Sequence, residues 1–462
     1  MDEVERLAPK TLHAEKRAGG NALHRSVRHH ALGWLVAANT VGLWLAALLL
    51  WPDLNDLTAP FTYGRWVPLH LDWQLYGWCA LPLIGALFRF YFSDSPAATR
   101  AGRLGLWAWT LALAYAGATW LAGGASGKLF INFAGSVRVV WSLALFVLWA
   151  VIAWHWLRVG RDRWARRSVI GPSGDGPSKN EPILGGALLL LLFAVPFLLY
   201  WASDPAVYPA VNPDSGGPTG SSLLGSTLVV VALFGVLPRL LRLKKIGSDR
   251  YFWPALILSA AFYAGMKHTH VSHHDFDQLA GMGLLLAWIP AMVVYARTYC
   301  WADNTRRWLA AAFGWWLGLV VTGFLFFLPG WSEHLKFTNA FVAHTHLAMA
   351  GLVTSLHVAI LLNLPGRWAP RVWSFWLWQA GCVMHIGVLS WLGWHEGAEP
   401  TLLYVRGGLV DWCYGLRFVA GAVMWLASIH WLWAAWKQEQ ETSNNLTADY
   451  TDRPLRRLWP DT

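Results

Sequence analysis

Apolar runs of about 18 residues or more recur along almost the whole chain, and no other feature restricts the fold so strongly. A run of this length is sufficient to cross the ~30 Å hydrocarbon core of a bilayer as a single α-helix. About twelve such segments are expected: 31–51, 67–93, 102–122, 135–157, 183–202, 220–242, 251–267, 278–297, 308–328, 337–363, 372–393 and 410–436. The sequence therefore predicts an all-α integral membrane protein with about twelve transmembrane helices.

Composition and charge agree with this prediction. The chain is 56% hydrophobic and only 13% charged, whereas roughly a quarter of the residues of a soluble protein are charged. The net charge of +10 gathers on alternate loops: "RVGRDRWARR" and "RLLRLKK" are strongly basic, while "SDPAVYPAVNPDSGGPTGSS" has no Lys or Arg. This positive-inside pattern places both termini in the cytoplasm. The basic balance is thus interpreted as topology, and no nucleic-acid partner is expected.

Three regions follow from this topology. Residues 1–30 form a basic cytoplasmic arm, residues 31–436 the membrane domain, and residues 437–462 a polar cytoplasmic tail. The arm has no apolar core, so it is not a cleavable signal peptide. Its histidines are expected to be solvated: His13, His24, His29 and His30.

Among the 17 histidines, three groups fall at the outer end of their predicted spans. They are His70, the group His268, His270, His273 and His274, and the pair His344 and His346. Since the topology was set from Lys and Arg alone, this shared depth indicates one common site. Isolated histidines inside spans are interpreted as satisfied hydrogen-bonding groups: His155, His357, His385 and His430.

The spacing of His344 and His346 restricts what they can bind. Residues two apart on an α-helix point ~200° apart with a rise of ~3 Å, so these imidazoles face opposite sides. They cannot easily chelate one ion, but they can serve two planar cofactors, and neutral imidazole is the usual axial ligand of haem iron. The alternative is two interhelical hydrogen bonds. A polar group within a span is costly unless it has a partner, so it is treated as a functional hypothesis by default. His70 lies at a matching depth, which favours the haem interpretation.

Four motifs carry a family resemblance: "VPLH" at His70, "AGMKHTH" before residue 271, "FTNAFVAHTH" ending at His346, and "LRFVAG" near the C-terminus. With these motifs the chain resembles the catalytic subunit I of haem–copper oxidases, most closely the cbb-type (C-family) branch. The resemblance implies a twelve-helix bundle in a bacterial inner membrane. It also implies that His70 and His346 are the axial ligands of a low-spin haem b, and that His344 is the proximal ligand of a second, high-spin haem.

The sequence departs from the family where copper is expected. The family holds copper with one His on the sixth helix and a His-His pair on the seventh, but here the matching positions carry Ser221, Lys267 and His268. A hydroxyl and an ammonium are poor copper ligands, so the usual copper centre is not expected. One alternative is a non-standard metal site built from His268, His270, His273 and His274. Another adds Asp275 and Asp277, and a third is a loop that is simply polar and wet.

A few other polar residues belong to the same regions. Arg417 is suited to a haem propionate, because a guanidinium fork matches a carboxylate; the alternative is that it snorkels to the interface. Asp72 lies two positions after His70 and is expected to face away from it. Glu333 and Glu396 are expected at the outer surface.

The function predicted from these features is electron transfer by a haem-b-binding membrane subunit without a normal copper centre. Its expected partners are membrane lipid and other subunits of a respiratory complex, such as a cytochrome c. Two alternatives remain open. One is an active terminal oxidase or nitric-oxide-type reductase with a displaced metal site, and the other is a haem- or gas-binding sensor or transporter. The chain is thus either an oxidoreductase or a non-catalytic electron-transfer homologue.

Overall fold

The computed structural model describes residues 4–93, 95–128, 130–167, 181–207, 219–272, 275–405 and 407–451. Side chains are described from residue 22 onward, except at 159–167, 181, 439 and 441–451. Within these ranges the chain is helical and contains no β-strand. The prediction of an all-α protein is confirmed for the described residues.

Ten helices within the described part of the chain are long and apolar enough to cross a membrane. They are Ala22–Leu50 within α1 (Val4–Leu50), α5 (Pro96–Leu121), Gly135–Arg158 within α6 (Gly135–Arg167), Pro182–Ala202 within α7 (Glu181–Ala202), α8 (Gly220–Leu240), α10 (Phe276–Arg297), Asp303–Phe327 including α11 (Arg306–Phe327), Asn339–Asn363, α15 (Val372–Ala398) and Gly408–Gln438 within α16 (Gly408–Thr451). Short connecting helices are α2 (Leu54–Leu57) and α12 (Trp331–Leu335).

Two of the twelve expected spans differ from these ten. The segment expected at 67–93 is a continuous helical run made of α3 (Tyr63–Asp72), η1 (Trp73–Cys79) and α4 (Ala80–Tyr91). The segment expected at 251–267 is α9 (Phe252–Gly265), with 14 residues. At 1.5 Å per residue α9 extends about 21 Å, short of the ~30 Å core. Among the described residues the structure therefore supports ten spans by length and composition, and the count of twelve stays a prediction.

Two helical runs contain a π-helical segment, and these two runs carry the predicted haem ligands. The segment η1 begins three residues after His70, and η3 (Leu347–Val353) begins directly after His346, between α13 (Asn339–His346) and α14 (Thr354–Asn363). Single π-turns inside α-helices are rare and are frequent at functional sites. The two runs therefore share a local distortion close to the residues of interest.

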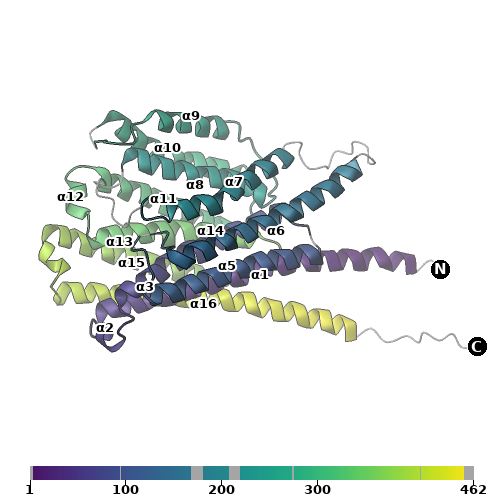
Figure 1. The fold of residues 1–462 in the computed structure, drawn as a ribbon, viewed down its shortest axis with the longest axis horizontal. Coiled ribbons are helices and arrows are strands. Elements are labelled where there is room, and N and C mark those ends of the chain that lie inside the picture. Colours follow the sequence, from purple (N-terminus) through teal and green to yellow (C-terminus); the bar gives the residue numbers. More distant parts are fainter. Residues whose placement is uncertain are drawn as a thin grey trace, which may run out of the picture.

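The long first and last helices pack side by side along the bundle (Figure 1). Trp425 of α16 donates a hydrogen bond from Nε1 to Thr40 Oγ1 of α1 at 2.9 Å. The N-terminal end of α1 and the C-terminal end of α16 lie at the same end of the bundle (Figure 1). This agrees with the expected location of both termini on one side of the membrane.

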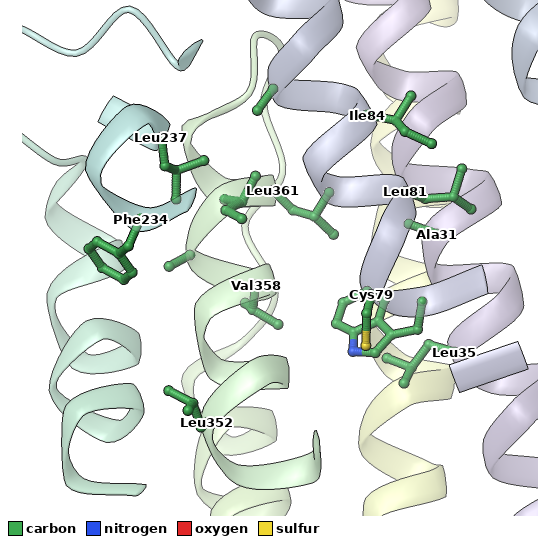
Figure 2. Close-up of a cluster of buried hydrophobic side chains, with 14 of the residues drawn as sticks. Ala31, Leu35, Cys79, Leu81, Ile84, Phe234, Leu237, Leu352, Val358 and Leu361 are labelled. Atoms are coloured by element: carbon green, nitrogen blue, oxygen red, sulfur yellow. The ribbon is translucent and has the colours of Figure 1, made fainter. Parts of the chain in front are cut away.

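Helix α14 lies in the apolar core between α8 on one side and α4 and α1 on the other (Figure 2). Its side chains Val358 and Leu361 are fully buried. The labelled neighbours are Phe234 and Leu237 of α8, Leu81 and Ile84 of α4, and Ala31 and Leu35 of α1 (Figure 2). The core thus fixes the run that carries His346 against the run that carries His70.

The basic arm is not solvated as far as residue 30, which corrects the sequence prediction. His24 is buried, and His30 Nδ1 lies 2.7 Å from Thr110 Oγ1. Arg28 is also buried and donates to the carbonyl oxygens of Leu361, in the last turn of α14, and of Leu364, just beyond its end. Polar groups of α1 find partners on neighbouring helices, so this part of the arm is packed inside the bundle. The side chain of His13 lies outside the described residues.

Apolar side chains also cover much of the outside of the bundle. On α7, for example, Leu190, Leu191 and Phe197 are exposed. An exposed apolar face of this length on a spanning helix is solvated by lipid tails. The expectation that membrane lipid is a partner is supported to this extent.

Candidate functional site

A cavity of about 300 Å³ lies between the helical runs that contain His70 and His346. Its walls come from α1, α3 and η1, α13 and η3, α15 and α16, with Phe130 from the connection between α5 and α6. The lining residues on the α13–α14 run extend from Phe341 to Thr354, about 19 Å of helix. The cavity is therefore elongated along the helices.

His70 and His346 face one another across this cavity. Their ring centroids are 6.4 Å apart and the ring planes differ by 24°. Nδ1 of His70 lies 2.9 Å from the carbonyl oxygen of Ala38, and Nδ1 of His346 lies 2.8 Å from that of Val342. A carbonyl accepts only, so Nδ1 carries the proton in both rings and Nε2 keeps its lone pair. Neither Nε2 has a hydrogen-bond partner among the described residues.

Gly42 allows His70 to approach α1 this closely. A Cβ added at Gly42 would lie 2.5 Å from Cε1 and 2.8 Å from Nδ1 of His70. Any other residue would displace the imidazole from its hydrogen bond to Ala38, one turn earlier on α1. In the sequence, Gly42 is a single glycine in an apolar run, and nothing nearby indicates that it contacts His70.

A third imidazole lies in the cavity, and the sequence did not indicate it. The ring of His385 on α15 is 4.4 Å from that of His346. His385 is buried, and neither of its ring nitrogens has a hydrogen-bond partner. The prediction of a satisfied, isolated histidine is therefore wrong at this position. An unpaired buried polar atom costs about 1–3 kcal/mol, so a polar group inside the cavity is expected to pair with it.

Other buried donors along the cavity also lack acceptors. Nδ2 of Asn39 and Nε of Arg417 have no partner, and no Asp or Glu is among the residues that line the cavity. Arg417 has the Tyr414 ring 6.0 Å from its guanidinium carbon. A cation in such a site requires an anion nearby. The lining therefore suits a ligand with acceptor or carboxylate groups, and Arg417 faces the cavity rather than the interface.

His344 lies on the other side of the same helix. Its Nδ1 is 2.8 Å from Thr322 Oγ1 of α11, and its ring lies 5.4 Å from that of Phe326. His346 instead contacts His70 and His385. The prediction that the two histidines face opposite sides is confirmed.

Glu396 fixes the beginning of α13, contrary to the prediction that it is a surface residue. It is 1% exposed. Its two carboxylate oxygens accept hydrogen bonds from the backbone N–H and from Nδ2 of Asn339 on α13, each at 2.6 Å. A carboxylate at a helix N-terminus is favourable because that end carries positive partial charge. Glu396 thereby holds the helix whose last residue is His346.

Asp72 faces away from His70, as predicted, and binds an outer connection of the bundle. Its carboxylate accepts from the backbone N–H of Ile131 at 3.2 Å and from Nδ2 of Asn132 at 2.7 Å. Both follow Phe130, which lines the cavity. Asp72 therefore holds the segment that closes one side of the cavity.

The histidine-rich segment after α9 is different. His268 and His270 are exposed, and Lys267 pairs with Asp275 at 3.6 Å. Neither histidine lines the cavity, while His273 and His274 lie outside the described residues. Among described residues, no group of three His, Cys, Asp or Glu side chains is arranged to hold a metal ion.

Ser221 and Lys267, at which the resemblance to the oxidases predicts copper ligands, are both linked to Gln278. The backbone N–H of Ser221 donates to Gln278 Oε1 at 2.9 Å, and Nε2 of Gln278 donates to the carbonyl of Lys267 at 3.0 Å. The amide of Gln278 thus joins these two segments.

Comparison with known proteins adds no assignment. No family model matches the chain, and no curated protein matches it.

Proposed function

We propose that this chain is a haem-binding, electron-transferring membrane protein, with one iron porphyrin held between His70 and His346. The observation that carries the proposal is the pair of imidazoles on two different helical runs, nearly parallel across a cavity. Each presents an unprotonated Nε2, which is the form that binds a metal. The backbone carbonyls that fix Nδ1 are the partners usually seen behind ligating histidines.

The spacing of the His70 and His346 rings favours a single metal bound between them. If His70 and His346 held one metal between them through Nε2, with metal–nitrogen bonds of ~2.0 Å, their ring centroids would lie roughly 6 Å apart. The measured distance is 6.4 Å. A bare ion would need further protein ligands, and no group of three such side chains is found among described residues. A planar metal complex that supplies its own equatorial ligands needs only two.

The remaining lining residues suit the edges of such a group. Unpaired donors come from Arg417, His385 and Asn39. The carboxylates of a porphyrin would accept hydrogen bonds from Arg417 and balance its charge. The bound group supplies reversible one-electron chemistry. The chain's own residues would bind and orient the group. Apolar side chains of the lining, such as Leu43 and Met424, would keep water away from it.

The second haem and the metal question belong to the same proposal. His344 is proposed as the ligand of another haem on the α11 side, because its Nδ1 is held by Thr322. A normal copper centre is not proposed, because Ser221 and Lys267 stand at two ligand positions and both are bonded to Gln278. Electron-donating or electron-accepting subunits, such as a cytochrome c, are proposed partners in a respiratory complex.

The test is a reduced-minus-oxidised absorbance spectrum of the purified protein, with haem extracted and quantified. A b-type low-spin spectrum is expected, with at least one haem for each chain. The His346→Ala variant should lose the low-spin bands, and His430→Ala should keep them as a matched control. A wild-type protein that purifies in its folded state without haem, and takes none up from added haemin, would contradict the proposal.

A further inference from the structure

His357 is a buried histidine one turn after Thr354, which lines the cavity. Both of its ring nitrogens face hydrogen-bond acceptors. Nδ1 lies 2.6 Å from the carbonyl oxygen of Val353, and Nε2 lies 2.6 Å from that of Cys79. The residue is 4% exposed. A neutral imidazole has one N–H and one lone pair, so it can satisfy only one of these carbonyls. Only the doubly protonated ring donates to both.

The two carbonyls come from the two runs that bear the proposed ligands. Cys79 is the last residue of η1 and Val353 is the last residue of η3. His357 therefore joins the His70 run to the His346 run at the points where their π-helical segments end. Cys79 lies in the buried core beside α14 (Figure 2).

The surroundings of His357 supply no counter-charge. Its interactions are with these two carbonyls and with the Trp78 ring, at 5.9 Å, and no charged side chain of the described residues acts on it. The one titratable side chain on a contacting residue is the Cys79 thiol. A buried cation without an anion is costly. Protonation here thus requires added negative charge nearby.

The cavity is the place where such charge can arise. Thr354, which lines the cavity, is one turn before His357, and its hydroxyl accepts from Trp78 Nε1 at 3.0 Å. Trp78 therefore contacts both the cavity wall and His357. A charge in the cavity and a charge on His357 would interact more strongly than in water, because both sites are enclosed by protein.

We propose that His357 is a proton-binding site coupled to the electron occupancy of the cavity. When a one-electron donor adds an electron to the group bound there, His357 takes one proton from the aqueous phase onto the ring nitrogen that lacks one. Loss of the electron releases that proton. One electron and one proton thus enter and leave together, and the net charge of the region is conserved. This inference rests on the proposed haem site.

His155 provides a matched control. It is equally buried, at 4% exposure, on α6. Its Nε2 accepts a hydrogen bond from the backbone N–H of Ser93 at 3.1 Å, so that nitrogen must be unprotonated. His155 therefore has a donor facing one ring nitrogen, whereas both ring nitrogens of His357 face acceptors.

The experiment is an equilibrium redox titration of the haem absorbance at a series of pH values, for wild type, His357→Gln and His155→Gln. The wild-type midpoint potential should fall as pH rises, approaching a tenfold change in the equilibrium constant per pH unit, which is 59 mV for one electron. His357→Gln should abolish most of this slope, and His155→Gln should retain it. If His357→Gln does not fold, His357→Asn replaces it and should also give a flat profile, since a neutral amide does not take up the proton.

The outcomes separate the two proposals. A haem-free wild type contradicts the proposed function itself. A bound haem whose potential has the same pH slope in wild type and in the His357 variants overturns only the role of His357. A wild-type potential that is independent of pH overturns it as well.

Discussion

The helix that carries His344 and His346 and the segment that carries His268 and His270 have similar sequences, "HTH" in both, but very different surroundings. On α13 the imidazoles lie among side chains of several other helices, and each Nδ1 has a fixed partner. After α9 the histidines are exposed, and His270 has a positive φ of 52°. Histidine density alone therefore does not define a site; convergence of separate helices does.

The comparison has an energetic basis. In the cavity, donors of His385, Arg417 and Asn39 are buried without acceptors, a condition that a bound ligand relieves. In the segment after α9, Asp275 and Asp277 already neutralise Lys267 and bind its backbone N–H. The first region thus has buried donors that a ligand would satisfy, whereas Lys267 in the second region is paired within the chain.

The largest expected effect separates these two regions directly. His70→Ala removes one of two proposed ligands, so the loss of haem affinity should exceed the roughly 10–100-fold typical when only an outer partner of a metal ligand is removed. His268→Ala should leave haem content unchanged. Haem quantification on both purified variants checks this, and equal loss in the two would show that the regions do not differ.

Gly42→Ala should disturb the site through packing alone. The new methyl group would overlap the His70 ring, and overpacking of this kind costs about 1–3 kcal/mol. Low-spin haem content and thermal stability should both fall. Gly33→Ala on the same helix meets no atom within 4 Å and is the control. Normal haem binding in Gly42→Ala would mean that His70 does not need its position against α1.

Glu396→Ala tests whether the start of α13 positions the histidines. Two donors of Asn339 would lose their acceptor, at about 1–3 kcal/mol of folding stability. The thermal midpoint should fall and the low-spin spectrum should broaden. The exposed Glu333 gives the control variant Glu333→Ala, which should behave as wild type. Identical melting of both variants would remove Glu396 from the account.

Arg417→Gln should have a smaller effect that depends on the ligand. A hydrogen bond to a charged group contributes about 1.5–3 kcal/mol, so affinity for haemin should fall roughly tenfold or more. Affinity for its dimethyl ester, which lacks the carboxylates, should change little. Spectroscopic titration of apoprotein with each compound measures the difference. An equal fall for both would show that Arg417 does not recognise carboxylates.

The smallest effect is expected for an exposed polar contact far from the cavity. The backbone N–H of Ala206, together with Arg138, holds the pKa of Asp204 below its ordinary value of 3.8. A lowered folded-state pKa gives stability that is present above the ordinary pKa and is lost as pH falls through the folded one. Asp204→Asn should remove this small acid-dependent loss below about pH 4. Thermal melts across pH 3–6 measure it, and an unchanged dependence would contradict the contact.

The sequence predicted the parts of the molecule that depend on local pattern. Long apolar runs predicted most spans, and two-residue spacing predicted the opposite faces of His344 and His346. The convergence of His70 with His346 followed from topology. These features succeed because helix geometry and the bilayer leave few alternatives.

The sequence could not predict features that depend on helix rotation and packing. His385 and Glu396 lie on α15 among other polar residues, and no local pattern distinguishes their buried sides. The two π-helical segments also have no evident signal, and they change which residues face the cavity. The burial of His24 and Arg28 was missed because such residues look solvated until the helices packed against them are known.

The most direct test is an experimental density map of the purified protein at a resolution that shows side chains. The account predicts planar density in the cavity, perpendicular to the line joining the His70 and His346 rings, with Nε2 of each at bonding distance from its centre. Lipid-like or absent density there, with both imidazoles bonded to other protein groups, would contradict it.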